Sequence, residues 1–249
     1  AFLFCVGTQI QLRTGGELLR RGIVLLLAKF FAGAVLGWVV GAIAGPAGIL
    51  GLSTLAIISA VTNSNGGMFM SLVGSYGDEA DVASQAILNI NDGPFLTLVA
   101  VGASGMADIP FKSLAIAIAP LVIGLILGNI DKDIADFAKG GLNLLIHFFA
   151  FCLGAGISLG NLVKGGLPGI LLGLITVVWS GLICILADKF ILKRPGYAGA
   201  AVSTAAGNCV ATPAAVALAA PSLEPYVESA TVQCAAAVIV TVILVPILT

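Results

Sequence analysis

Long apolar runs dominate the chain, and short polar stretches interrupt some of them. A membrane-spanning helix needs ~20 apolar residues, and eight such runs can be drawn in this sequence. They lie at roughly 22–44, 51–75, 84–105, 111–128, 141–158, 168–188, 197–220 and 227–249. A ninth run, "AFLFCVGTQIQL", reads as the end of a span whose beginning is missing, so we expect a truncated N-terminus. The pattern predicts an all-α, polytopic membrane protein.

The composition supports a lipid environment and argues against several functions. The chain is 59% hydrophobic and 9% charged, whereas soluble domains average about 25% charged residues. The net charge of -1 gives no support for a nucleic-acid partner. One histidine and five scattered cysteines favour neither a metal centre nor a disulfide scaffold. We find no nucleophile–base set or phosphate loop, so we predict no catalytic residues, no metal site, no cofactor and no enzyme.

Positive charges segregate when the predicted spans alternate across the bilayer. Nine cations fall on one side, at Arg13, Arg20, Arg21, Lys29, Lys132, Lys139, Lys189, Lys193 and Arg194, against Lys112 and Lys164 on the other. The rich side is predicted to be cytoplasmic, and the C-terminus then also lies in the cytoplasm. Lys29 is expected near the cytoplasmic end of its span, where it can snorkel. Asp78, Glu79 and Asp81 are expected to form a solvated loop.

Two segments of the chain recur at a nearly constant offset. Phe4-Cys5 returns as Phe151-Cys152, 147 positions later, and the polar break at 60–68 aligns with 204–212 at an offset of about 144. Five predicted spans separate equivalent points, so the two copies run in opposite directions. Inverted repeats with broken helices at matching positions are typical of secondary transporters. The first repeat is predicted at 1–105 and the second at 106–249, which gives ten helices in the full protein.

The stretch "TNSNGGMF", at 62–69, places polar residues inside an apolar run. A break there frees backbone groups that hydrocarbon cannot satisfy, and glycines tolerate the unusual backbone angles. Freed helix N-termini favour a carboxylate. A second break, "TAAGNCVATP", lies at 204–213. The substrate-binding candidates in the two breaks are Thr62, Asn63, Ser64, Asn65, Gly66, Asn208 and Thr212. The alternative is a pair of kinked helices that pack on small residues.

A third polar group lies in "SQAILNINDGPF", at 84–95. Gln85, Asn89 and Asp92 are spaced i, i+4 and i+7, so they share one face of a helix. An acid at that depth marks an ion or proton pathway by default. The second repeat offers Glu228 and Gln233 instead. These five residues are the predicted proton-coupling set. Asp92 as a neutral hydrogen-bonding carboxyl and Glu228 as an outer-surface residue are the alternatives. His147 is expected to have a packing role.

At "TNSNGGMFMSLVGSYGDEADVASQAILNINDGPFLTLVAVGASGMADIP", 62–110, the chain closely resembles the bacterial 2-keto-3-deoxygluconate permeases. The resemblance implies an inner-membrane symporter that takes up this sugar acid with protons. That family looks related to the bile-acid/sodium symporter superfamily, whose members have two inverted five-helix repeats with two crossed, discontinuous helices. The resemblance places those helices at 51–75 and 197–220. It implies a core domain from 22–105 and 168–249 and a panel domain from 1–12 and 111–158.

The sequence therefore predicts a proton-coupled importer of 2-keto-3-deoxygluconate that works by alternating access in the inner membrane. A sodium-coupled symporter of another organic anion is the main alternative, with the coupling ion held by oxygens at the same breaks. A passive channel and a membrane enzyme are weaker alternatives. The expected partners are a sugar acid and the lipid bilayer. The oligomeric state stays open, a homo-oligomer included.

Overall fold

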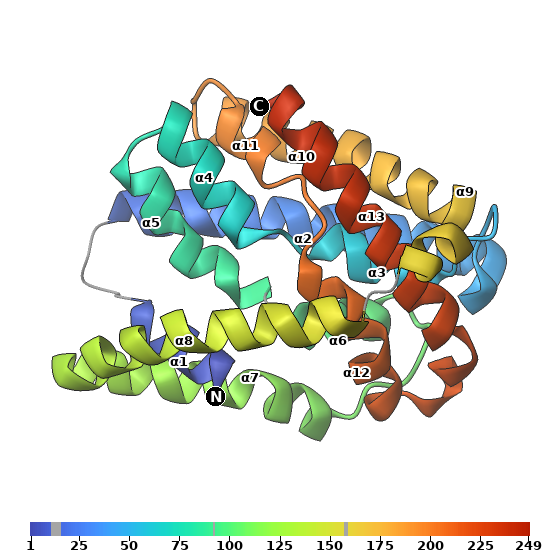
Figure 1. The fold of residues 1–249 in the computed structure, drawn as a ribbon, viewed down its shortest axis with the longest axis horizontal. Coiled ribbons are helices and arrows are strands. Elements are labelled where there is room, and N and C mark those ends of the chain that lie inside the picture. Colours follow the sequence, from blue (N-terminus) through green and yellow to red (C-terminus); the bar gives the residue numbers. More distant parts are fainter. Residues whose placement is uncertain (11–15, 92, 157–158) are drawn as a thin grey trace.

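The structure, a computed structural model, describes residues 1–10, 16–91, 93–156 and 159–249, and these ranges form a bundle of helices (Figure 1). The α-helices are α1 (Phe2–Gln9), α2 (Gly16–Ala44), α3 (Thr54–Thr62), α4 (Gly66–Tyr76), α5 (Glu79–Leu88), α6 (Phe95–Ala103), α7 (Phe111–Ile130), α8 (Lys132–Gly156), α9 (Leu159–Ile175), α10 (Gly181–Leu186), α11 (Tyr197–Ala201), α12 (Thr212–Ala219) and α13 (Val227–Leu248). Short 3₁₀ or π turns are η1 (Gly45–Ala47), η2 (Asn89–Asn91), η3 (Thr176–Ser180), η4 (Ala187–Ile191), η5 (Gly207–Val210) and η6 (Pro221–Tyr226). Within the described ranges no β-strand occurs, in agreement with the predicted all-α class.

Four helical stretches in the described chain are long and apolar enough to cross a membrane. They are Gly16–Ala47, Phe111–Ile130, Gly165–Ile191 and Pro221–Leu248, and the bent pair formed by α5–η2 and α6 makes a fifth if it counts as one span. The predicted span at 141–158 falls largely within α8, whereas 51–75 and 197–220 each contain two α-helices and a break. The structure thus supports a polytopic membrane protein, and the total of nine spans stays a prediction.

Helices α1, α7 and α8 pack against one another and lie together along one side of the molecule (Figure 1). Glycines let α1 and α7 approach backbone to backbone. A Cβ atom added at Gly7 would lie 2.1 Å from the carbonyl oxygen of Leu121, and one at Gly124 would lie 2.1 Å from that of Phe4. Such small-residue contacts are the usual basis of helix association in lipid, where no hydrophobic force drives helices together.

The remaining long helices form a second group. Helix α2 packs against α3, α5 and α6, while α13 packs against α9 and α3. Large apolar side chains nevertheless remain on the outside, for example Trp38, Phe111 and Ile247, whose exposed fractions are 55%, 84% and 79%. Apolar surface of this extent would be a liability in water, but it is what lipid contact requires.

Of the three acids expected in a solvated loop, Asp78 and Glu79 are exposed, whereas Asp81, in the first turn of α5, is buried, so the expectation was wrong for Asp81 alone. The Asp81 side chain is 1% exposed and accepts hydrogen bonds from Arg21 at 2.9 Å, from the Tyr197 hydroxyl at 2.9 Å and from Arg194. Asp78 caps α5 in a capping box with Asp81. These contacts join α2, the α4–α5 turn and α11, which lie far apart in the sequence.

Asp78 is half-exposed and also pairs with Arg21, whose Nη1 lies 2.6 Å from its Oδ1. Partial burial opposes ionisation of this carboxyl, but the hydrogen bond from Arg21 and one from the backbone of Asp81 outweigh it and lower the pKa of Asp78 to about 2. The carboxylate therefore stays ionised at any physiological pH.

Candidate functional site

The first predicted break interrupts the chain between α3 and α4. Helix α3 ends at Thr62, α4 begins at Gly66, and Asn63 and Asn65 have extended backbone angles. The Asn65 side chain accepts a hydrogen bond from the backbone N–H of Met68 at 3.1 Å, so it caps the new helix. Asn63 and Ser64 are each 1% exposed. A polar, non-helical segment therefore lies inside the bundle, as the sequence predicted.

Side chains from α5, η2 and α6 surround this first break. Thr97 lies 3.1 Å from the Thr62 hydroxyl, oxygen to oxygen, and the Asn91 amide donates to the Ser64 hydroxyl at 2.9 Å. The predicted residues Gln85 and Asn89 are there too. The Gln85 Nε2 donates to the Asn89 Oδ1, and a Cβ added at Gly66 would lie 2.3 Å from that Gln85 nitrogen. A side chain at position 66 would therefore displace the Gln85 amide.

The second break separates α11 from α12. Helix α11 ends at Ala201, the 3₁₀ turn η5 begins at Gly207, and α12 begins at Thr212. Asn208 and Thr212 are both buried, and the Thr212 hydroxyl donates to the Asn208 carbonyl at 3.0 Å. The backbone N–H of Ala205 donates to the Thr241 hydroxyl of α13 at 3.1 Å. The freed backbone is thus partly satisfied by a side chain from a neighbouring helix, as the membrane interior demands.

The two breaks meet. The backbone N–H of Asn65 donates to the hydroxyl oxygen of Thr204 at 2.7 Å, across 139 positions of sequence. Thr204 is fully buried. Helix α4 packs against α11, and α3 packs against η5 and α12. The ends of four helices therefore converge at one place, which the sequence pattern predicted without indicating which atoms make the contact.

Several oxygen atoms at the first break are buried and have no hydrogen-bond partner among the described residues. They are the amide oxygens of Asn63, Gln85 and Asn91 and the hydroxyl of Ser59. A buried polar atom without a partner is destabilising and calls for an explanation. Amide oxygens accept hydrogen bonds from hydroxyl groups and can coordinate a monovalent cation. Within the described ranges no three His, Cys, Asp or Glu side chains converge on a metal-sized site.

The predicted proton-coupling residues divide into two groups. Gln85 and Asn89 lie at the first break, as described above. Asp92 lies outside the described residues; its neighbour Asn91 contacts Ser64. Glu228 and Gln233 are elsewhere, near the start of α13.

Gln233 fixes the beginning of α3 rather than its broken end. Its Nε2 donates to the Gly51 carbonyl at 2.8 Å, and its Oε1 accepts from the backbone N–H of Ser53 at 3.4 Å. Gly51 and Ser53 lie at the opposite end of α3 from Thr62, which is about 13 Å away at a rise of 1.5 Å per residue. Glu228 is exposed. The structure therefore does not bring these two residues to the meeting point of the breaks.

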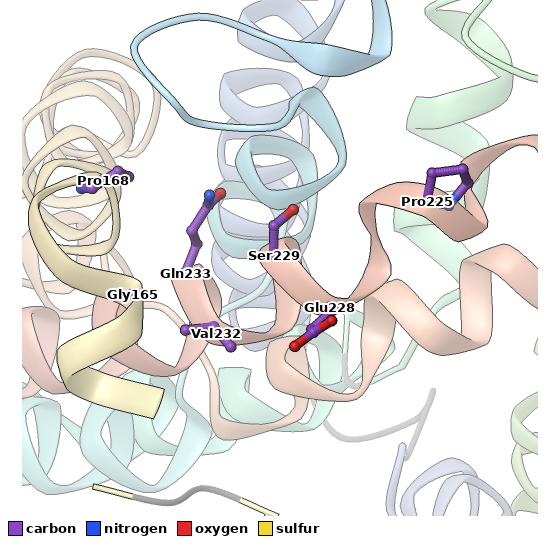
Figure 2. A pocket seen from close by; sticks show the side chains of 7 residues that line it. All are labelled: Gly165, Pro168, Pro225, Glu228, Ser229, Val232 and Gln233. Atoms are coloured by element: carbon purple, nitrogen blue, oxygen red, sulfur yellow. The ribbon is translucent and has the colours of Figure 1, made fainter. Parts of the chain in front are cut away.

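A separate cavity of about 320 Å³ opens beside Glu228 and Gln233. Its lining residues come from α9, η6 and α13 and are Gly165, Pro168, Pro225, Glu228, Ser229, Val232 and Gln233 (Figure 2). In Figure 2 the Glu228 carboxylate and the Gln233 amide point in different directions, so they do not form one polar group within this cavity.

Lys29 is the largest departure from the sequence prediction. It was expected to snorkel at a helix end, but its side chain is fully buried, and its Nζ donates to the Ser180 hydroxyl at 2.9 Å. Sequence reasoning also missed Asn91, Thr97 and Thr204. The signal for Asn91 was its place beside Asp92, and the signal for Thr204 was its place at the head of the second polar segment.

The fold and this polar centre define a class: an all-helical membrane protein with two interrupted helices that meet inside the bundle. Comparison with known proteins identifies the family. The chain matches the 2-keto-3-deoxygluconate permease family over residues 1–249 and belongs to it, as the resemblance indicated. The family consists of permeases, not enzymes.

Named relatives agree along the whole chain. The chain is 48% identical over 249 residues to 2-keto-3-deoxygluconate permease 1 of Salmonella typhimurium, covering 100% of this chain and 78% of the relative. It is 40% identical over 253 residues to the 2-keto-3-deoxygluconate permease of Bacillus subtilis, covering 100% and 77%. It is 37% identical over 257 residues to the permease of that name from Xanthomonas oryzae pv. oryzae, covering 100% and 80%.

Proposed function

We propose that this protein is a secondary active transporter that imports 2-keto-3-deoxygluconate together with protons by alternating access. The observation that supports it most directly is the hydrogen bond from the Asn65 N–H to the Thr204 hydroxyl. It joins two helix breaks that lie in opposite halves of the chain. Discontinuous helices that meet at the repeat interface form the substrate sites of many secondary transporters.

The proposed architecture has ten helices in two inverted five-helix repeats, with crossed helices at 51–75 and 197–220. The packing of α1 with α7 and α8 supports a panel domain from 1–12 and 111–158. The core domain then comprises 22–105 and 168–249. In this orientation Arg20, Arg21 and Arg194 face the cytoplasm of a bacterial inner membrane, and the C-terminus lies on the same side.

The proposed cargo fits the chemistry of the breaks. 2-Keto-3-deoxygluconate carries a carboxylate, a keto group and several hydroxyls. The unpartnered amide oxygens of Asn63, Gln85 and Asn91 are acceptors for its hydroxyl groups. The start of α4 at Gly66 offers a helix N-terminus, which favours a carboxylate. Thr62, Ser64 and Asn65 complete the proposed site in the first break, and Asn208 and Thr212 in the second.

Asp92 is the proposed carrier of the coupling proton. Protonation of this acid would remove a negative charge that repels the incoming anion. Binding of the proton would therefore be coupled to binding of the sugar acid. The preceding residue, Asn91, contacts Ser64 in the first break, which supports this assignment.

Sodium coupling is the second candidate, because unpartnered oxygens are also ligands for a monovalent cation. In that case the amide and hydroxyl oxygens of the first break would hold the ion, and the cargo could be another organic anion.

Uptake of labelled 2-keto-3-deoxygluconate into proteoliposomes tests the proposal. The purified protein should accumulate the sugar acid when a pH gradient is imposed, and an uncoupler should abolish accumulation. Asp92→Asn should lose accumulation but retain some exchange of internal for external substrate. Asp136→Asn, an exposed acid in α8, is the matched control and should behave like the parent protein. Accumulation that requires sodium at fixed pH would favour the second candidate, and uptake that never exceeds equilibrium would indicate a passive facilitator.

A further inference from the structure

Lys29 is a buried lysine that has no carboxylate partner among the described residues. Lys29 is fully buried about halfway along α2, and its hydrogen bond goes to a neutral hydroxyl, that of Ser180. Among the described residues it forms no ion pair, whereas Arg21 and Arg194, also largely buried, each pair with Asp81. Burial of a charged ammonium group is unfavourable unless an anion or several hydrogen bonds balance it.

The lysine lies beside both helix breaks. One turn further along α2, a Cβ added at Gly33 would lie 2.4 Å from the Thr62 side chain, at the end of α3. The partner of Lys29, Ser180, is followed by Gly181. A Cβ added at Gly181 would lie 3.4 Å from the side chain of Ser203, in the second break. Helix α2 therefore places the Lys29 amine close to the point where the two breaks converge.

Among the described residues, the titratable groups that interact with this amine are thiols and not carboxylates. Cys184 on α10 and Cys209 on η5 are close enough to interact with it electrostatically. Asp188, on η4, interacts with Cys184 but approaches Arg194 instead of the lysine. Neither α3 nor α6 contains a titratable residue. The acids of α5 are in its first turn, where Asp81 pairs with Arg21. The described protein thus leaves a positive charge beside the breaks without a matching negative one.

We propose that Lys29 is the fixed positive charge that balances the carboxylate of the cargo at the helix breaks, a role that rests on the proposed function. The Lys29 ammonium group attracts the carboxylate electrostatically, across Ser180 and η5. The charge count then explains why an anion needs a proton. The empty carrier is neutral when Lys29 is protonated and the coupling acid is ionised. The loaded carrier is neutral again when the anion is bound and the acid has taken one proton.

Two consequences follow. Uptake should be electroneutral, with one proton for each anion. Removal of the lysine charge should weaken binding of the anion and leave binding of an uncharged analogue unchanged. An attraction across about 6 to 12 Å at an effective dielectric constant of about 20 corresponds to about 10- to 100-fold in affinity.

The test uses the full chain in proteoliposomes and compares two competitors of labelled uptake, 2-keto-3-deoxygluconate and its uncharged methyl ester. Lys29→Gln should raise the inhibitory concentration of the anion about 10- to 100-fold and change that of the ester less than about twofold. Lys29→Arg should restore most of the anion affinity. Lys112→Gln, an exposed lysine of α7, is the matched control and should leave both competitors unchanged.

The results separate this proposal from the proposed function. If the parent protein takes up no sugar acid, the proposed function fails. If the parent transports but Lys29→Gln binds the anion normally, or loses anion and ester equally, the counter-charge role alone is refuted. A second measurement needs no variant: with valinomycin and potassium setting the membrane potential, parent uptake driven by a pH gradient should change less than about twofold. Strong dependence on potential would overturn the charge balance.

Discussion

The contact between the two breaks can be removed with one atom-for-atom change. Thr204→Val replaces the hydroxyl that accepts the Asn65 N–H with a methyl group of similar size. The bond is short, 2.7 Å, and Thr204 is fully buried, while Asn65 is partly exposed. A buried N–H left without an acceptor destabilises a protein by about 1–3 kcal/mol. Because Asn65 is partly exposed, we expect the lower part of that range, about 1–2 kcal/mol.

A loss of that size should be visible in both stability and transport. In detergent, the midpoint of thermal unfolding should fall by about 2–8 °C for a chain of this length. If the contact also sets the geometry of the site, the apparent affinity for the cargo should fall about 5- to 30-fold. Thr204→Ser keeps the acceptor oxygen and should stay close to the parent in both measurements. Unfolding midpoints and affinities that agree for all three proteins would refute the claim that this bond holds the breaks together.

Three further predictions concern the surrounding structure. Gly33→Ala places a methyl group 2.4 Å from the Thr62 side chain and should destabilise the protein by about 1–3 kcal/mol in thermal unfolding, whereas Gly140→Ala, with nothing within 4 Å, should not. Asp81→Asn leaves two guanidinium groups without the buried negative charge that they share, and the unfolding free energy should drop by about 3–5 kcal/mol; an unchanged midpoint would contradict this. Because the folded-state pKa of Asp78 is depressed to about 2, its ion pair should stabilise the protein fully above about pH 4 and progressively less as the pH falls toward 2. The midpoints of the parent and of Asp78→Asn, which keeps the helix cap, should therefore converge over that interval, and a constant difference would be evidence against it.

The broken helices were predictable because their cause is local. Hydrocarbon leaves an interrupted helix no partner for its backbone, so amide, hydroxyl and glycine residues inside an apolar run mark the interruption. Thr62 to Gly66 were found in this way. Asn91 was not predicted, because Gln85, Asn89 and Asp92 were placed on one face of a regular α-helix with 3.6 residues per turn. The 3₁₀ turn η2 begins at Asn89 and tightens the helix to about 3 residues per turn, so Asn91 comes round to Ser64.

The position of Thr204 marked it as part of the second break, but its contact with Asn65 could not be predicted from the sequence, since the hydroxyl of a threonine in a membrane span usually bonds within its own helix. The hydroxyls of Thr62, Thr176 and Thr212 all donate to the carbonyl four positions earlier, and such residues carry no information about distant contacts. Thr204 differs because it follows the end of α11. Its partner, Asn65, lies in the other half of the chain, and no short-range pattern specifies that pairing.

The depth of Lys29 follows from which face of α2 is turned inward. Gly22, Gly33 and Gly37 each lie within overlap distance of another helix, since a Cβ there would come 2.6 Å from Ile87, 2.4 Å from Thr62 and 2.2 Å from Ile58. Lys29 is seven positions after the first of these glycines and four before the second, so it shares their face. A lysine can snorkel only along lipid or a groove that leads to water, and neither borders this face. Charge counted along the sequence assigned the residue to the cytoplasmic surface; the glycine spacing assigns it to the interior, where its charge must be included in any mechanism that moves an anion through the molecule.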